Sequence, residues 1–115
     1  MLRLTPDMLA AAYDFVRETQ PFKGWGLPES DDIGFAVVKD TTMYADFCLY
    51  NGEPLIRVSE KLHGHTVTLL ATIAHEAIHL YQHLNKLDRG GEHNADFKRR
   101  AKKVCEIHGF DPKTF

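Results

Sequence analysis

The sequence predicts an α+β domain in which a small sheet lies between helical segments along the chain. The prediction depends on an amphipathic helical pattern near the N-terminus, three short strand-like runs in the middle, and two helical segments after them. With 115 residues, the chain is long enough to bury one core and too short for two. We therefore expect a single domain over residues 1–115, with no zinc ribbon attached.

The first helix is predicted from its capping residues and its apolar spacing. Thr5 is a suitable N-cap, Pro6 suits the first helical position, and Asp7 suits the positive end of the helix dipole. Apolar side chains then recur at helical spacing, at Leu9, Ala12, Tyr13 and Val16. The helix is expected to end near Thr19, before a loop rich in glycine, proline and acidic residues.

Three strands are predicted in residues 33–40, 42–50 and 54–59, where β-branched and aromatic side chains gather. Asn51-Gly52 separates the last two runs, and this dipeptide is typical of a tight hairpin turn. The simplest arrangement is a three-stranded antiparallel meander.

Two helices complete the predicted fold, one over residues 65–86 and one over residues 94–108. A glycine-rich break at residues 87–93 separates them. Gly109 is expected to cap the last helix, and Pro112 stands just beyond it.

The long helix carries an unusual polar stripe. Successive helical residues are about 100° apart, so His79 lies about 40° from His75, His83 about 80° and Glu76 about 100°. The rest of the helix is apolar over half its circumference or more, as expected of an element that is packed on several sides. The stripe is therefore narrow and consists of residue types that bind metals.

Residues 75–79 form the pattern HExxH. Two histidines four residues apart on a helix can both reach one Zn²⁺, and the glutamate next to the first can contact a metal-bound water. Zinc lowers the pKa of that water, and the Glu76 carboxylate can take its proton during attack on a peptide carbonyl. The sequence therefore predicts one zinc ion per chain, with His75 and His79 as ligands and Glu76 as general base.

A catalytic zinc site needs a third protein ligand, and Glu92 and His93 both follow the glycine-rich break. Glu92 together with Asp96 spells ExxxD, the arrangement of the thermolysin-like enzymes. However, His93 would lie on the side of the last helix that carries Phe97, which must face the core, whereas Glu92 would point toward the basic side. The positions therefore favour His93 over Glu92.

Three further residues are candidates for the surroundings of the site. His83 is either a substrate-side group or simply the stripe residue at the exposed end of the helix. Asp96 either orients a ligand imidazole or is a favourable acid in the first turn of the last helix. Tyr81 is one of four candidate donors to the oxyanion that forms during hydrolysis, together with Tyr50, His83 and Arg89.

The C-terminal part of the chain has a basic character that the net charge of −2 conceals. Residues 61–115 hold nine basic and six acidic side chains. Four of the basic ones form adjoining i,i+4 rows on the last helix, at Lys98, Arg99, Lys102 and Lys103. These four residues, called the basic row below, either contact nucleic acid weakly or form the solvated outer face of a core helix. Trp25 is either a stacking platform or a plug at the edge of the core.

Several classes of protein are disfavoured. No apolar run is long enough for a membrane span, and the N-terminus lacks the apolar segment of a signal peptide. Cys48 and Cys105 stand far apart without a CxxC motif, so we expect two reduced thiols in a cytoplasmic protein.

The strand run "PLIRVSEKL", the helix "LLATIAHEAIHLYQHL" and the segment "EHNADF" together resemble the SprT-like metallopeptidase domain, over residues 33–109. That family's pattern continues from HExxH to a third histidine with phenylalanine four residues later, as at His93 and Phe97. The resemblance implies that His75, His79 and His93 bind zinc, that Glu76 is the base, and that the chain hydrolyses polypeptides, in the best-known members proteins crosslinked to DNA.

Three alternatives remain at the level of the sequence. A zinc-stabilised module that binds protein or DNA without turnover would keep the same ligands and would not need Glu76. A glutamate-ligand peptidase would use Glu92 instead of His93. A regulatory protease or toxin would cut one folded partner. The favoured hypothesis is instead a peptidase that acts on extended or unfolded chains.

Overall fold

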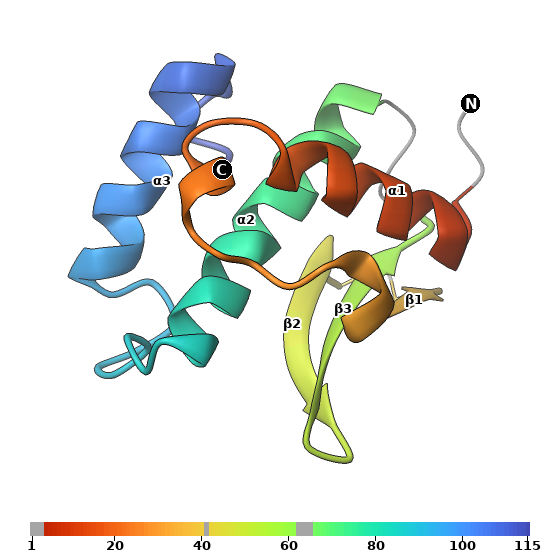
Figure 1. The fold of residues 1–115 in the computed structure, drawn as a ribbon. Helices are drawn as coiled ribbons and strands as arrows, with labels where there is room; N and C mark the ends of the chain where they lie inside the picture. Colours follow the sequence, from red (N-terminus) through yellow and green to blue (C-terminus); the bar gives the residue numbers. More distant parts are fainter. Residues whose placement is uncertain (1–3, 41, 62–65) are drawn as a thin grey trace.

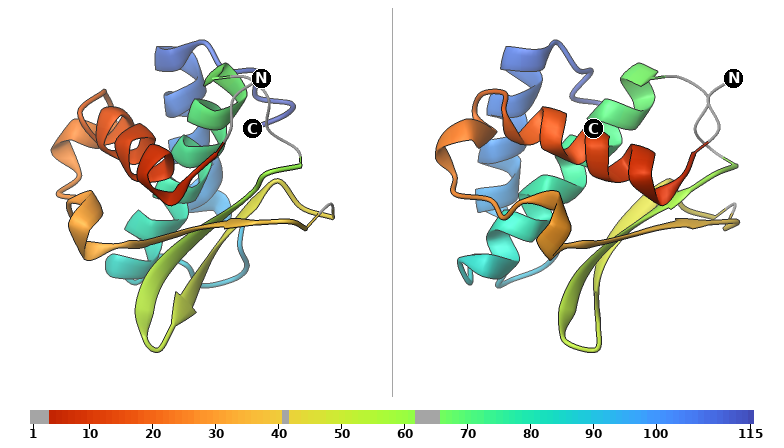
Figure 2. Two further views of the ribbon diagram at one scale, coloured as in Figure 1. Left: turned by 90° about the vertical axis from the view of Figure 1, so that its right-hand side faces the viewer. Right: turned by 45° about the vertical axis from the view of Figure 1, so that its right-hand side comes forward.

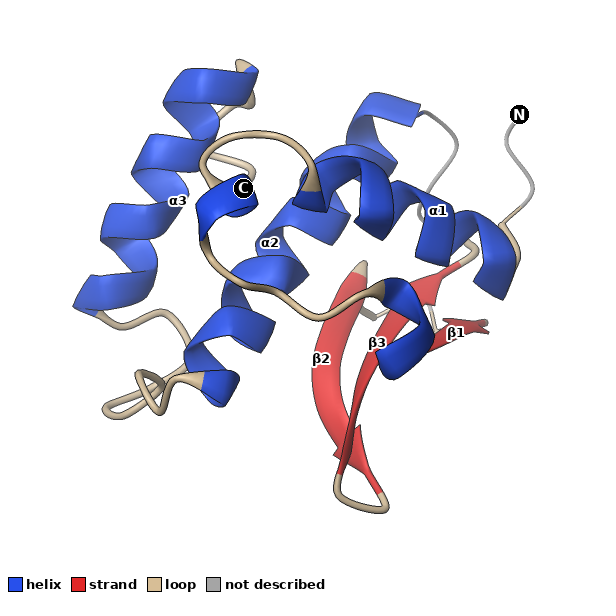
Figure 3. Cartoon of the chain, in the orientation of Figure 1, coloured by secondary structure: helices blue, strands red, loops and turns tan. Residues whose placement is uncertain are grey.

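The computed structural model describes residues 4–40, 42–61 and 66–115, with the side chains of residues 66 and 67 left out. Within these ranges the chain forms three α-helices and a three-stranded sheet, which confirms the α+β class. The bounds are α1 Pro6–Arg17, β1 Gly34–Val38, β2 Ala45–Tyr50, β3 Glu53–Ser59, α2 Thr66–Leu84 and α3 Ala95–His108. Two short 3-10 turns, Phe22–Gly24 and Ser30–Asp32, lie between α1 and β1. Figure 3 shows the helices and strands by colour.

Helix α1 begins as its sequence predicts. The Thr5 side chain accepts a hydrogen bond from the backbone N–H of Met8 at 3.2 Å, and Pro6 occupies the first turn. The helix ends at Arg17, two residues before the predicted end. Its buried side chains are Leu9, Tyr13 and Val16.

The sheet has three strands, but its order differs from the predicted meander. The order is β1-β3-β2, with β2 antiparallel to β3 and β1 parallel to β3. The hairpin between β2 and β3 turns at Asn51 and Gly52, whose φ angles of 52° and 79° suit the expected turn. The prediction was therefore right about this hairpin and wrong about a sheet that is antiparallel throughout.

The burial of β3 explains why it takes the central position. Ile56 and Val58 of β3 are fully buried, so this strand gains most from a neighbour on each edge. Ile56 lies between Phe35 of β1 and Phe47 of β2 in the register. Consecutive strands need not pair: β1 ends at Val38 opposite Ser59 and β2 begins at Ala45 opposite Val58, so both of these strand ends lie at the same end of β3.

The helices cover one face of the sheet (Figure 1). Helix α1 contacts β1 and α2, α2 contacts β2, and α3 packs against the other side of α2. Both views of Figure 2 show the tip of the β2–β3 hairpin projecting away from the helices. Helix α2 is therefore the central element, and its apolar side chains are buried on several sides, as its sequence predicts.

Helix α3 has the predicted C-cap at Gly109, and Asn94, predicted as its first residue, is instead its N-cap. The Asn94 side chain accepts a hydrogen bond from the backbone N–H of Phe97, and Gly109 adopts a left-handed conformation with a φ of 77°. Beyond Gly109, the last residues turn back so that Phe115 lies beside His75 of α2. None of the helices in the described part of the chain combines the length and apolar character needed to span a bilayer. Both cysteines are free, with Cys105 buried and Cys48 half-buried.

Candidate metal centre

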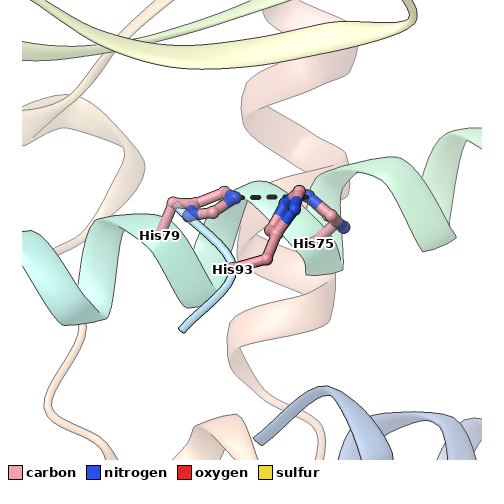
Figure 4. Close-up of side chains that lie close together, drawn as sticks. All are labelled: His75, His79 and His93. Atoms are coloured by element: carbon pink, nitrogen blue, oxygen red, sulfur yellow. Dashed lines mark hydrogen bonds between the residues drawn. The ribbon is translucent and has the colours of Figure 1, made fainter. Parts of the chain in front are cut away.

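Three histidines from two parts of the chain meet at one point (Figure 4). His75 and His79 stand one turn apart on α2, and His93 stands in the loop two residues before α3. The Nε2 atom of His75 lies 3.2 Å from Nε2 of His79 and 3.3 Å from Nε2 of His93. One ligand atom from each imidazole lies within 4.8 Å of the other two.

These separations match those expected around a small cation. Two nitrogens bound to zinc at 2.0–2.1 Å with tetrahedral angles would be about 3.3 Å apart. The Nδ1 atom of His75 lies 3.1 Å from the backbone oxygen of Phe115, which can only accept a hydrogen bond. Nδ1 of His75 therefore carries the proton in the neutral ring. The single lone pair on Nε2 of His75 faces two neighbouring imidazoles, an arrangement better suited to a shared cation than to two hydrogen bonds.

One aromatic ring supports all three imidazoles. The Phe97 ring centroid lies 4.9 Å from that of His75, 4.6 Å from that of His79 and 4.7 Å from that of His93. Phe97 is buried and stacks nearly parallel to His79. It closes one side of the centre to water and restricts the orientation of the rings.

Burial keeps the two helical histidines neutral. Desolvation, reinforced by the neighbouring imidazoles, lowers the pKa of His75 to about 4, and desolvation with His93 lowers the pKa of His79 to about 4. Neutral imidazoles present the lone pairs that metal binding requires.

Glu76 directly follows His75 on α2 but is not among the described residues that could share one ion. Its side chain is buried, and desolvation followed by the charges of Asp46 and Glu92 raises its pKa to about 8. A buried carboxylate with a raised pKa is a stronger proton acceptor than an exposed one.

A cleft of about 770 Å³ gives access to this side of the centre. His75 and Glu76 form part of its wall. The residues before and at the start of β2, the first half of α2 and the residues after α3 supply the rest, which comprises Tyr44, Ala45, Thr68, Ala71, Thr72, Gly109, Phe110, Asp111, Thr114 and Phe115.

This geometry agrees with a comparison against protein families. The sequence model of the SprT-like family matches residues 8–115. The chain belongs to the SprT-like family. Among curated proteins, none matches this chain.

Of the two candidates for the third position, His93 is the one that lies in the group with His75 and His79. Among the described residues, the histidine group contains His93 and does not contain Glu92, which is exposed. Glu92 still lies near enough for its charge to raise the pKa values of His75 and Glu76. The geometry thus supports the three-histidine site over the glutamate-ligand alternative.

Two of the candidate surrounding residues, His83 and Tyr81, pack on aromatic rings outside the group of three histidines. The His83 ring packs on Phe47 of β2, with centroids 5.6 Å apart. Tyr81 packs against Trp25, with centroids 4.7 Å apart, and the guanidinium of Arg100 lies over both rings. Trp25 is thus engaged at the edge of the core, which leaves its ring poorly placed to stack on a nucleic acid base.

Asp96 accepts hydrogen bonds from Gln82, Arg99 and Arg100. These bonds outweigh its partial desolvation and lower its pKa. Asp96 therefore belongs to a polar cluster with Gln82, Arg99 and Arg100 and is not part of the group of three histidines.

The four basic residues of the predicted row on α3 are exposed, and two of them lie beside His93. Lys98 and Lys102 line a smaller cavity of about 220 Å³ that also includes His93. Arg99 is paired with Asp96 at 3.3 Å, and Lys103 is exposed on the adjoining row.

Sequence reasoning missed two polar groups, one that contacts His75 and one that is buried farther along α2. The backbone oxygen of Phe115 holds His75, and no local sequence signal marks such a contact. Gln82 is fully buried. The sequence did contain a sign of it, because Gln82 lies seven residues after His75 and therefore only about 20° from it around the helix, on the same side.

Proposed function

We propose that this SprT-like domain is a zinc-dependent endopeptidase that hydrolyses peptide bonds in extended polypeptides. The observation that carries the proposal is the convergence of three imidazole Nε2 atoms next to a buried carboxylate at the wall of a cleft. Membership of the SprT-like family supports the same activity. Zinc suits a set of three imidazole ligands, which leaves one position of a tetrahedron open.

When bound at His75, His79 and His93, zinc supplies a Lewis acid that activates water near neutral pH and polarises a carbonyl. The protein's own contribution to the chemistry is Glu76. Its carboxylate takes a proton from the attacking water and can return it to the leaving amine. The raised pKa of about 8 in the metal-free protein makes the Glu76 carboxylate a good proton acceptor. A nearby cation would lower this pKa toward neutral pH.

The substrate is proposed to lie along β2. This strand forms one edge of the sheet and contacts α2, and Ala45 at its start lines the cleft. Pairing with a sheet edge holds a peptide in the extended form that hydrolysis needs. The cleft-lining residues include Tyr44 but none of the four oxyanion donors considered from the sequence, which are Tyr50, Tyr81, His83 and Arg89.

Weak nucleic acid binding is a second proposal, which accompanies peptidase activity rather than replacing it. It rests on the exposed α3 residues Lys98, Lys102 and Lys103 and on the position of the first two beside His93. A phosphate backbone bound there would bring a DNA-associated protein near the centre. Substrates crosslinked to DNA would fit this arrangement.

The experiment that tests the main proposal compares wild type with Glu76→Gln. Both proteins should hold zinc, because Glu76 is not among the three candidate ligands. The variant should lose at least about 100-fold in casein hydrolysis, the usual effect of removing a general base. Activity near that of wild type would remove Glu76 from the mechanism. No activity in either protein would favour the zinc-stabilised binding module.

A further inference from the structure

Gln82 is a fully buried amide on the helix that carries the HExxH motif. It lies two turns beyond His75 on the same side of α2, and so continues the stripe of metal-binding residues. Buried amides are retained at an energetic cost unless they are hydrogen-bonded. The contacts of Gln82 therefore indicate what it is for.

The Gln82 side chain joins α2 to the start of α3. Its Nε2 atom donates to Oδ1 of Asn94 at 3.0 Å and to Oδ2 of Asp96 at 2.9 Å. Both partners are acceptors, so the opposite orientation of the amide would place its oxygen against two oxygens. Its Oε1 atom is buried without a hydrogen-bond partner among the described residues. The two hydrogen bonds of the amide nitrogen are therefore made although the buried Oε1 atom loses its hydration without a replacement partner.

Asn94 extends this connection through the loop between the helices. Its Nδ2 atom donates to the backbone oxygens of Leu87 at 2.9 Å and Arg89 at 2.8 Å, while its Oδ1 atom caps α3. One side chain thus holds both the beginning of the loop and the first turn of the next helix. Asn94 directly follows His93 in the chain.

Asp96 anchors the same region from the other side. It accepts a hydrogen bond from Nε of Arg100 at 3.0 Å, and the Arg100 guanidinium lies over the rings of Trp25 and Tyr81. This cluster attaches the first turn of α3 to the core.

His93 itself has few other restraints. It is exposed, it follows Gly90 and Gly91, which have φ angles of 85° and 118°, and its ring contacts only Phe97 and the other two imidazoles among the described aromatic side chains. Its position relative to His75 must therefore come largely from the residue that follows it.

We propose that Gln82 is a positioning residue that sets the location of His93 in the metal centre through Asn94. The proposal rests on the metal site of the proposed function and is independent of peptide hydrolysis. It assigns to the HExxH helix a second task, which is to hold the loop that delivers the third ligand.

The test is zinc affinity, measured by competition with a chromogenic chelator, together with the thermal midpoint of the metal-free protein. Gln82→Met keeps the length of the side chain and removes the amide. It should weaken zinc binding by about 10- to 100-fold, as is typical when a group that orients a metal ligand is lost. Val104→Ala is the matched control, because Val104 is likewise fully buried but lies in α3 ten residues after Asn94, and its hydrocarbon side chain can make no hydrogen bond. At temperatures where it is folded, this control should keep zinc affinity within about threefold of wild type.

Cobalt substitution provides a readout that general destabilisation would not change. The visible spectrum of Co²⁺ should differ between Gln82→Met and wild type, because a displaced His93 alters the coordination geometry, and Val104→Ala should keep the wild-type spectrum. If Gln82→Met does not fold, Asn94→Asp tests the same connection, since it keeps the capping oxygen and removes both donors to the loop. A folded variant with wild-type zinc affinity and cobalt spectrum would overturn the proposal. Wild-type protein that binds zinc without cleaving casein would overturn the proposed function and leave this test intact.

Discussion

The Nε2 atom of His93 lies 3.3 Å from Nε2 of His75, although 18 residues separate the two in the chain. The other pair, His75 and His79, is brought together by one turn of helix, which any HExxH helix would achieve. The contact with His93 instead requires that the loop before α3 is folded, that α3 is capped, and that the Phe97 ring packs against all three imidazoles.

Phe97 should contribute to both stability and metal binding. Replacing this buried ring by alanine removes the surface on which all three imidazoles lie, so Phe97→Ala should lower the free energy of unfolding by about 3–5 kcal/mol. Urea unfolding of the metal-free protein measures this loss, and zinc titration at low temperature measures the weaker affinity. Phe97→Leu should lose less of both. Equal zinc affinity in wild type and a folded Phe97→Ala would show that the ring has no part in orienting the ligands.

The metal-free protein should lose stability as the pH falls from about 6.5 to 4. His75 and His79 have pKa values of about 4 in the folded state, below the ordinary value of 6.5, so the unfolded chain takes up protons first. The loss should reach a few kcal/mol and level off below the folded pKa. Chemical unfolding at several pH values in the presence of a chelator measures it.

His79→Ala is the control for this pH dependence, because it removes one of the two responsible groups. Its stability should fall less steeply over the same window. The account of the two imidazoles would be contradicted by equal slopes in wild type and variant.

Glu76 should make the metal-free protein less stable at alkaline pH. Its folded pKa of about 8 lies above the ordinary value of 4.5, so the folded state holds a proton that the unfolded state releases as the pH rises. Glu76→Gln should therefore be more stable than wild type at pH 8, by on the order of a few kcal/mol, with little difference at pH 4. Thermal unfolding of both proteins with chelator at the two pH values decides this, and a variant that is less stable at pH 8 would refute it.

Helix α3 should carry any nucleic acid affinity of the domain. Replacement of Lys98, Arg99, Lys102 and Lys103 by alanine should weaken binding to single-stranded DNA and reduce its dependence on salt concentration. Fluorescence anisotropy at two salt concentrations measures both effects. Lys39 and Lys61, which lie outside α3, provide a matched pair of exposed basic residues for a control variant. Unchanged affinity for single-stranded DNA in the fourfold variant would show that these four residues are only a solvated surface of α3.

Local sequence patterns were sufficient for much of the fold. Thr5 and Gly109 cap their helices as predicted, because capping depends on a few neighbouring residues. The Asn51-Gly52 hairpin follows for the same reason. The order of the strands did not follow, because it depends on which strand buries most surface once the helices have packed.

In the metal centre, too, the features set by local sequence could be predicted and those set by tertiary packing could not. His75 and His79 could be placed from helical periodicity alone, and the choice of His93 over Glu92 followed from the faces of α3. The role of Phe115 could not be foreseen, since its backbone oxygen reaches His75 only after the chain turns back beyond α3. Gln82 stood on the right side of α2, but its partners Asn94 and Asp96 are set by the conformation of an irregular loop.

Zinc content per chain, measured side by side in purified wild type, His93→Ala and Glu92→Ala, tests the central claim most directly. A three-histidine centre predicts about one zinc in wild type and in Glu92→Ala, and a clear loss in His93→Ala. Retention of zinc by His93→Ala together with its loss from Glu92→Ala would contradict the account and transfer the third ligand to the carboxylate.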